Sequence, residues 1–180
     1  METDGRRAVT SNVRVRPLAR HDVPKLRDAL AEGTVADTTR RLFPRSLPSM
    51  LDWYDQLQLS REMSPFAIAM NASLIGYCAL RPPVYSGREL VIAIFDPRYH
   101  GKGIGTHAVR EMCAFGFGTL KLQRIELGVY PTNRRAISCY VRCGFREEAL
   151  LRKFIYHEGV WVDLTLMSLV RPQKGQKGDA

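Results

Sequence analysis

Residues 91–106 read VIAIFDPRYHGKGIGT: an apolar run, a short polar break, and a loop in which three glycines alternate with other residues. Glycine loses more conformational entropy on folding than any other residue, so three glycines within five positions need a physical reason. A tight turn from a strand into a helix would be one reason. A chemical reason is that the N–H groups of such a turn, at the positive end of a helix dipole, can surround a diphosphate.

The loop lacks the spacing of two well-known phosphate-binding motifs. A dinucleotide-binding fingerprint has the pattern G-x-G-x-x-G, whereas here Thr106 follows Gly105 and no second βαβ half is recognisable. A P-loop has Gly-Lys followed by Ser or Thr, whereas Lys102 is followed by Gly103. What remains is a short turn of amides with Lys102 as a nearby cation. Taken alone, the loop leaves open whether it binds a phosphate or only turns the chain.

Apolar periodicity on both sides of the loop predicts one α/β domain with a mixed sheet. Asn71-Ala72 separates two apolar runs and indicates a hairpin, and Gly144 is placed to end a helix. Asp22 and Ser49 are placed to cap the starts of two further helices. Strands are expected at residues 13–16, 65–70, 73–80, 88–95, 124–130, 145–156 and 160–170, and helices after Asp22, after Ser49, from the glycine loop to about 117, and from Pro131 to Gly144.

Length, charge and cysteine content limit the class of protein. The chain has 180 residues and a net charge of +9, but its arginines are scattered, which does not favour nucleic acid as a partner. No apolar run would span a bilayer and no secretory signal pattern is recognisable, so a cytoplasmic protein with no membrane partner is expected. The four cysteines form no CxxC pair, so no metal site is expected. Residues 1–12 are expected to be flexible, and residues 171–180 to form a disordered basic tail.

A second segment favours the interpretation of the glycine loop as a phosphate-binding site. Residues 129–145 read VYPTNRRAISCYVRCGF, one strand and one helix after the loop. Together the two segments resemble the Gcn5-related N-acetyltransferase (GNAT) superfamily, and more narrowly its RimJ/RimL-like branch. There the loop reads Gln/Arg-x-x-Gly-x-Gly/Ala, and the later segment Asn-x-x-Ala-x-x-x-Tyr-x-x-x-Gly-Phe, which Asn133, Ala136, Tyr140 and Gly144-Phe145 match.

The similarity extends over residues 13–170 and implies a single GNAT-like domain. It implies an α/β (α+β) fold with a mixed, mostly antiparallel, twisted sheet of about seven strands. The sheet should contain a central splayed parallel pair and be flanked by about four helices. Two frames satisfy the loop pattern, Arg98-x-x-Gly101-x-Gly103 and His100-x-x-Gly103-x-Gly105, and we prefer the second because the helix should begin beside Ile104. His100 then stands where the family has Arg or Gln.

The resemblance implies acetyl-CoA as cosubstrate, held in a V-shaped gap between strands 88–95 and 124–130. Backbone groups near Ala93 and Phe95 are expected to pair with the pantetheine arm, as an added strand would. Asn133 would fix the end of the pantetheine, and Arg135 or Arg134 would meet the phosphate of the adenosine. The diphosphate would lie on the loop residues His100, Gly101, Lys102, Gly103, Ile104, Gly105 and Thr106.

The implied reaction is direct attack of an amine on the thioester in a ternary complex. Such a reaction needs a base for the amine, stabilisation of the oxyanion, and a proton for the leaving thiolate. Tyr140 is the candidate acid, and its alternative interpretation is a core aromatic on an amphipathic helix. Glu89, at the start of an apolar strand, is the candidate base, and its alternative is an exposed charge at a strand end. A backbone N–H near residues 93–95 would stabilise the oxyanion.

The acceptor amine stays open. The RimJ/RimL-like appearance suggests a protein N-terminal α-amine, while near relatives acetylate small-molecule amines. Acceptor choice in the family depends on segments that correspond to residues 33–64 and 81–88. Two other functions remain as alternatives: a non-catalytic acetyl-CoA-binding sensor, and a basic nucleic-acid-binding protein. A homodimer through the final hairpin, residues 145–170, is a further hypothesis.

Overall fold

The computed structural model describes residues 12–32, 43–60, 62–82, 87–157 and 159–171. The termini for which flexibility is expected lie almost entirely outside these ranges. The described chain contains the 3-10 helices η1 (Arg20–Asp22) and η2 (Pro97–Tyr99), the α-helices α2 (Val23–Ala31), α4 (Leu47–Ser60), α5 (Ile104–Gly118) and α6 (Arg134–Arg142), and the strands β1 (Val13–Pro17), β2 (Ser64–Met70), β3 (Ser73–Arg81), β4 (Arg88–Ile94), β5 (Arg124–Val129), β6 (Arg146–His157) and β7 (Val160–Val170).

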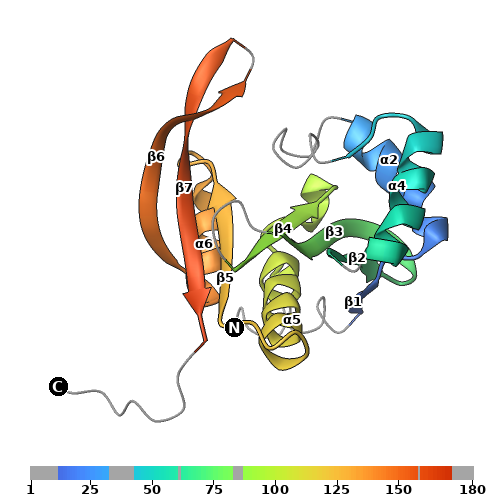
Figure 1. The fold of residues 1–180 in the computed structure, drawn as a ribbon, viewed down its shortest axis with the longest axis horizontal. Helices are drawn as coiled ribbons and strands as arrows, with labels where there is room; N and C mark the ends of the chain where they lie inside the picture. Colours follow the sequence, from blue (N-terminus) through green and yellow to red (C-terminus); the bar gives the residue numbers. More distant parts are fainter. Residues whose placement is uncertain (1–11, 33–42, 61, 83–86, 158, 172–180) are drawn as a thin grey trace.

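The seven strands form one sheet in the order β1-β2-β3-β4-β5-β7-β6 (Figure 1). Every neighbouring pair is antiparallel except β4 and β5, which are parallel. The parallel pair is in register at only two positions, Arg88 opposite Ile125 and Glu89 opposite Glu126. Both positions lie at the start of the strands, so β4 and β5 diverge toward their carboxyl ends. The predicted fold class, including the splayed central pair, is confirmed.

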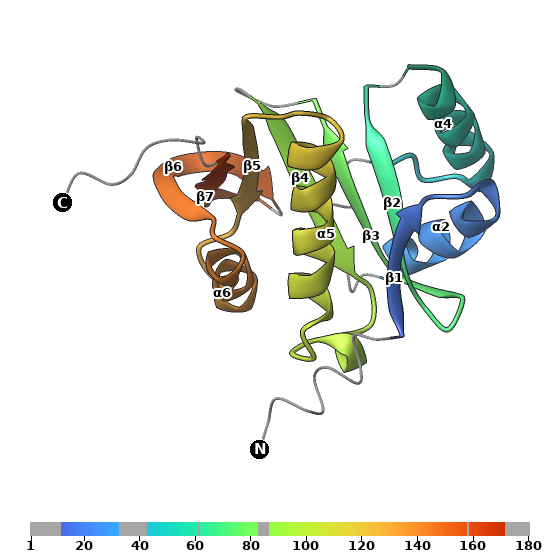
Figure 2. The same ribbon diagram turned by 90° about the horizontal axis from the view of Figure 1, so that it is seen from below.

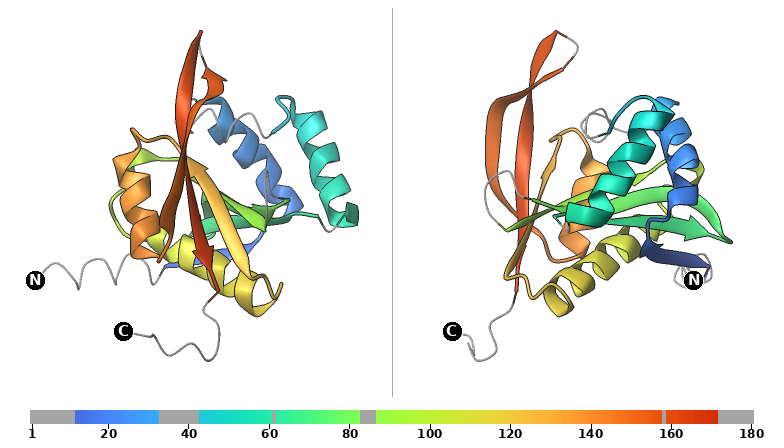
Figure 3. Two further views of the ribbon diagram at one scale, coloured as in Figure 1. Left: turned by 60° about the vertical axis from the view of Figure 1, so that its left-hand side comes forward. Right: turned by 45° about the vertical axis from the view of Figure 1, so that its right-hand side comes forward.

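Helices cover both faces of the sheet. Side chains alternate along a strand, so Leu90 and Val91 of β4 point to opposite faces. Leu90 belongs to a core cluster with residues of α5 and α6, and Val91 to a second cluster with residues of α2 and α4. Figures 2 and 3 show the same division, with α5 on one side of the β2–β4 half of the sheet and α2 and α4 on the other.

The β6–β7 hairpin projects beyond the rest of the sheet (Figure 1). Its pairing is irregular between Leu151 and Ile155, where the register shifts. At this bulge Lys153 has a φ of 50°, and its N–H donates to the Asp163 carboxylate at 2.8 Å. Asp163 therefore supports the turn of the backbone, and the hairpin beyond it carries an exposed aromatic pair, Tyr156 and Trp161, with ring centroids 5.2 Å apart.

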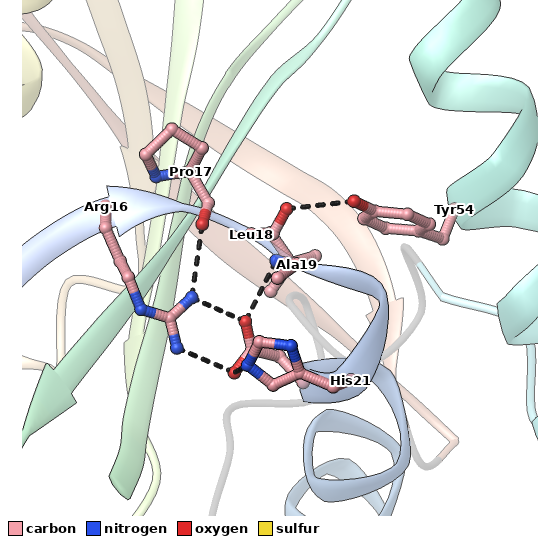
Figure 4. Close-up of polar contacts among 7 residues, drawn as sticks. Arg16, Pro17, Leu18, Ala19, His21 and Tyr54 are labelled. Atoms are coloured by element: carbon pink, nitrogen blue, oxygen red, sulfur yellow. Dashed lines mark hydrogen bonds and ion pairs between the residues drawn. The ribbon is translucent and has the colours of Figure 1, made fainter. Parts of the chain in front are cut away.

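An ion pair between the buried Asp22 and the half-buried Arg16 fixes the corner between β1 and α2 (Figure 4). Arg16 donates two hydrogen bonds to the Asp22 carboxylate, at 2.6 and 2.8 Å, and the Ala19 N–H donates a third at 2.9 Å. Asp22 stands at the residue before α2, as expected, but its carboxylate faces back toward β1 and makes no capping bond to the helix. The Tyr54 hydroxyl of α4 donates to the Leu18 carbonyl at 3.1 Å and attaches the second helix to the same corner.

The start of α4 also differs from the expectation. The helix begins at Leu47, two residues before the predicted cap Ser49. The side chain of Ser46 accepts the Ser49 N–H at 3.2 Å and so occupies the capping role. The sequence reads Ser46-Leu47-Pro48-Ser49, and proline is well tolerated in a first helical turn, so the earlier serine suits the cap. Within the described ranges, no helix has the length and apolarity needed to cross a membrane.

Candidate active site

The gap between β4 and β5 exposes one side of β4. The Phe95 N–H donates to the Ile75 carbonyl of β3 at 3.0 Å. The Ala93 carbonyl lies against Gly76 of β3, 2.6 Å from where a Cβ would stand there. The backbone groups of these two residues therefore face β3. Successive residues of a strand direct their N–H and C=O groups to opposite neighbours, so those of Ile92 and Ile94 face the gap. This geometry revises the prediction that Ala93 and Phe95 present the backbone to a cofactor.

The glycine loop joins η2 to the first turn of α5 beside this gap. Gly101 and Gly103 have φ values of 75° and 83°, a left-handed conformation that favours glycine. Gly103 is the N-cap of α5, and the helix begins at Ile104, where the preferred frame of the motif expects it. Gly105 is different, because it is helical and an added Cβ would meet only the Cys139 sulfur, at an ordinary 3.7 Å. Conformation therefore explains two of the three glycines, and the third leaves space beside helix N–H groups that have no partner in the helix.

His100 connects the two sides of the gap at its open end. Its Nε2 lies 3.1 Å from the carbonyl oxygen of Ile94, at the end of β4, and its Nδ1 lies 2.6 Å from a guanidinium nitrogen of Arg135, in α6. Arginine has no acceptor, so Nδ1 must accept from Arg135, and the ring proton sits on Nε2 and is donated to Ile94. The structure thus brings together two residues predicted to bind the cofactor, and it gives His100 a side-chain role.

Asn133 and Tyr140 lie on α6, which follows β5. Asn133 is the N-cap of the helix, and its side-chain oxygen accepts the Ala136 N–H at 3.1 Å. Tyr140 is 9% exposed, and its ring centroid lies 6.0 Å from that of Phe145. Gly144 has a φ of 94° and turns the chain so that Phe145 returns beneath Tyr140. The Asn-x-x-Ala and Tyr-x-x-x-Gly-Phe spacings therefore have a structural basis, independent of chemistry. Burial raises the pKa of Tyr140, so its phenol stays protonated at neutral pH.

Glu89 lies where β4 and β5 are still paired. Its side chain is 17% exposed, so the alternative interpretation as a free strand-end charge is wrong. Both contacts from Arg81 fall on the same carboxylate oxygen: Nε at 3.0 Å and Nη2 at 2.7 Å from Oε2. Burial raises the pKa of Glu89 and Arg81 opposes that rise, with a raised pKa as the net result. A carboxyl group with a raised pKa suits a general base.

Sequence reasoning missed the residues that surround Glu89. Glu126 of β5 is 2% exposed, and Arg124 Nε lies 3.3 Å from its Oε2. Arg124 also donates to Glu148 of β6 at 2.8 Å, and Glu148 accepts a hydrogen bond from Ser168 of β7. The signal that could have revealed this network is the pattern RIELGV, in which a glutamate stands within an otherwise apolar strand.

Cys139 of α6 and Cys143, the C-cap of that helix, contact the first turn of α5. The two cysteines are four positions apart, and both sulfurs approach Thr106. The Cys139 sulfur lies 3.3 Å from the Thr106 hydroxyl, and the Cys143 thiol lies 3.7 Å from the Thr106 carbonyl. A hydrogen bond from Cys143 lowers the pKa of Cys139. The described residues contain no group of three or more His, Cys, Asp or Glu side chains arranged to hold a metal ion.

Comparison with known proteins identifies the family to which this chain belongs. The acetyltransferase (GNAT) domain model matches residues 12–146. The chain belongs to this family, whose members transfer an acetyl group from acetyl-CoA to an amine, and the predicted family membership is confirmed.

Individual relatives are more distant. The probable N-acetyltransferase YjcK of Bacillus subtilis is 38% identical over 81 residues, which is 45% of this chain and 45% of that protein. The match to this relative therefore spans less than half of its length. The spermidine N(1)-acetyltransferase of Escherichia coli K12 is 27% identical over 167 residues, covering 90% of this chain and 88% of that protein.

A solved structure shares the fold. The dodecameric spermidine N-acetyltransferase from Vibrio cholerae superposes with a TM-score of 0.76 at 23% identity, covering 89% of this chain and 94% of that one. At this identity the similarity concerns the arrangement of the chain.

Proposed function

We propose that the protein transfers the acetyl group of acetyl-CoA to a primary amine by direct attack in a ternary complex. The observation that carries the proposal is the sheet itself: β4 and β5 pair at two positions and then diverge, with Glu89 at the junction and the glycine loop at the open end. The backbone of Ile92 and Ile94, the amides of the loop and Asn133 would hold acetyl-CoA, whose thioester supplies an activated acetyl group. When the cofactor binds, Arg135 would release its contact to His100 and donate to a phosphate of the cofactor instead.

The candidate base and acid lie on opposite faces of the sheet. Glu89 shares the face of Val91, which packs with α2 and α4, whereas Tyr140 belongs to the cluster beneath α5 and α6. A thioester held in the gap would be accessible from both faces. Arg81 occupies Oε2 of Glu89, so Oε1 is the oxygen placed to take a proton from the amine. Tyr140 would protonate the departing thiolate.

The acceptor would approach on the face that Glu89 shares. Figure 1 shows this face of β4 between α2 and α4 on one side and the β6–β7 hairpin on the other. Residues 33–42 and 83–86, part of the segments expected to select the acceptor, fall outside the described ranges. We place the chain in the RimJ/RimL-like branch because of its two motifs, which suggests a protein N-terminal α-amine. The spermidine acetyltransferases among its relatives make polyamines the main small-molecule alternative.

The test is thioester consumption with acetyl-CoA and a panel of N-terminal peptides, polyamines and amino acids. We expect turnover with one class, and Glu89→Gln should lower kcat by about 100-fold or more. Glu111→Gln, on the exposed side of α5, is the matched control and should leave kcat unchanged. Tight binding of acetyl-CoA by calorimetry without turnover of any amine would support the sensor alternative and overturn the catalytic proposal.

We also propose that the protein forms a homo-oligomer through the β6 edge of the sheet. β6 is the last strand in the order of the described sheet, and the structurally similar Vibrio cholerae enzyme is a dodecamer. Light scattering after size exclusion would detect it. A molar mass of one chain, 20.4 kDa, at micromolar concentration would contradict the proposal.

A further inference from the structure

A row of polar side chains crosses the sheet at the closed end of the gap. Arg81 of β3 is directly opposite Glu89 of β4, Glu89 opposite Glu126 of β5, and Glu126 opposite Ser168 of β7. Residues that are directly opposite project from the same face, so all four lie on the face that α2 and α4 cover. The flanking positions on this face of β3 and β4 are Ala79 and Val91, which are buried and apolar. Charges in such a setting are costly unless paired, and here Arg81 pairs with Glu89 and Arg124 pairs with Glu126.

The Glu89 carboxylate lies between two groups with opposite effects on its charge. Neighbouring strands lie about 4.8 Å apart, so Glu126 stands close enough to Glu89 to repel its negative charge. Arg81 acts from the other side and stabilises that charge through two contacts to Oε2. Among the described residues, Arg81 and Glu126 are the charged groups that shift the titration of Glu89, and Arg124 and Glu148 stand behind Glu126.

We propose that Arg81 and Glu126 are positioning residues for acetyl transfer, which act through Glu89. Arg81 holds one carboxylate oxygen and so directs Oε1 toward the acceptor amine. Glu126 offsets the charge of Arg81 and so opposes the lowering of the Glu89 pKa by that arginine. The inference rests on the proposed function, in which Glu89 is the base. An arginine alone beside Glu89 would lower its pKa and make it a weaker base, and a glutamate alone beside it would raise its pKa and leave less of the basic form at a given pH.

The two influences can be separated by substitution. Arg81→Gln removes stabilisation of the Glu89 carboxylate, so the Glu89 pKa should rise by about one unit. Glu126→Gln removes the repulsion, so the Glu89 pKa should fall by a similar amount. The double variant should lie near the wild type. The readout is ¹³C NMR titration of protein labelled at the glutamate carboxyl carbons, with Glu89→Gln to assign the signal.

Kinetics give the second readout. The acidic limb of the pH profile of kcat/KM should move to higher pH in Arg81→Gln and to lower pH in Glu126→Gln. At a fixed pH on that limb, kcat/KM should therefore fall about tenfold in Arg81→Gln. Arg20→Gln, which breaks the exposed Arg20–Asp55 pair, is the matched control and should move neither readout. If Arg81→Gln does not fold, Arg81→Lys keeps the charge and loses the second contact, and should give a smaller upward shift.

Different results would contradict the positioning roles of Arg81 and Glu126 and the role of Glu89 as base. Shifts of the Glu89 signal in the same direction in both single variants, or no shift in either, would overturn the inference even if Glu89→Gln abolishes turnover. Full turnover by Glu89→Gln would instead overturn the role of Glu89 as base, and with it the positioning roles. NMR shifts in opposite directions without movement of the kinetic limb would also count against the positioning roles.

Discussion

Glu89 and Tyr140 illustrate how burial prepares two side chains for opposite tasks. Burial disfavours the charged form of both, so the pKa of each is raised. For the carboxyl group this strengthens a base, and Arg81 keeps the shift small enough for the charged form to exist. For the phenol it keeps the proton in place at neutral pH, so that Tyr140 is protonated when the thiolate departs. The surroundings of each group, more than its identity, decide its use.

Removing the Tyr140 hydroxyl tests its role as acid. Tyr140→Phe keeps the ring that packs on Phe145, so stability should be preserved, whereas kcat should fall by about 100-fold. Steady-state kinetics and thermal unfolding check both expectations. Tyr99→Phe, the matched control on a partly buried tyrosine of η2, should keep full kcat. Unchanged kcat in Tyr140→Phe would return this residue to a packing role.

At the scale of elements, the sequence predicts most strands and helices to within a few residues. Apolar periodicity and turn residues are local signals, and both survive in the fold. Which residues of β4 turn their N–H and C=O groups toward the gap could not be predicted. The segment VIAIF is apolar at every position, so its pattern does not distinguish one set of alternate residues from the other. The Arg81–Glu89–Glu126 row was missed for a related reason: it depends on register between three strands, which no single segment encodes.

The glycine loop and α5 give a prediction at this scale. Gly101→Ala meets open space but forces alanine to a φ of 75°, so it should destabilise the protein by about 1 kcal/mol. Gly105→Ala is helical and fits, so it should leave stability equal or higher, yet it should weaken acetyl-CoA binding because the methyl group enters the space left for the diphosphate. Urea unfolding and calorimetry with acetyl-CoA provide the two measurements. Equal affinity of Gly105→Ala and the wild type would remove the loop from the binding site.

The corner between β1 and α2 predicts a dependence of stability on pH. Burial raises the pKa of Asp22, but hydrogen bonds from Arg16 and the Ala19 N–H outweigh that effect, and the pKa is lowered. The stabilisation is therefore complete above the unfolded pKa of about 3.9 and is lost as pH falls through the lower folded value. Asp22→Asn should destabilise the protein by about 1–3 kcal/mol at pH 7.

Urea titrations of wild type and Asp22→Asn at several pH values check this. The difference between the two should be constant from about pH 5 to pH 8 and shrink below about pH 4. Asp55→Asn, which removes the exposed partner of Arg20, is the control and should have little effect at any pH. A difference that grows on acidification would contradict the assigned direction.

At the scale of the whole molecule, the sheet consists of two antiparallel halves, β1–β4 and β5–β7, joined by two residue pairs. A cofactor arm that pairs with β4 would extend the contact between the halves. We therefore expect the amides of Ile92 and Ile94 to exchange with solvent faster in the free protein and to gain protection with acetyl-CoA. Hydrogen exchange followed by NMR tests this, with the Phe95 amide, already bonded to Ile75, as an internal control.

The short parallel pairing of β4 and β5 has a consequence for resistance to proteolysis. A ligand that binds only the folded state adds stability as its concentration rises above its dissociation constant, by about 2.7 kcal/mol at a hundredfold excess. Proteases that attack opened chains respond to that same equilibrium. Resistance of this protein to a protease should then rise with the concentration of acetyl-CoA.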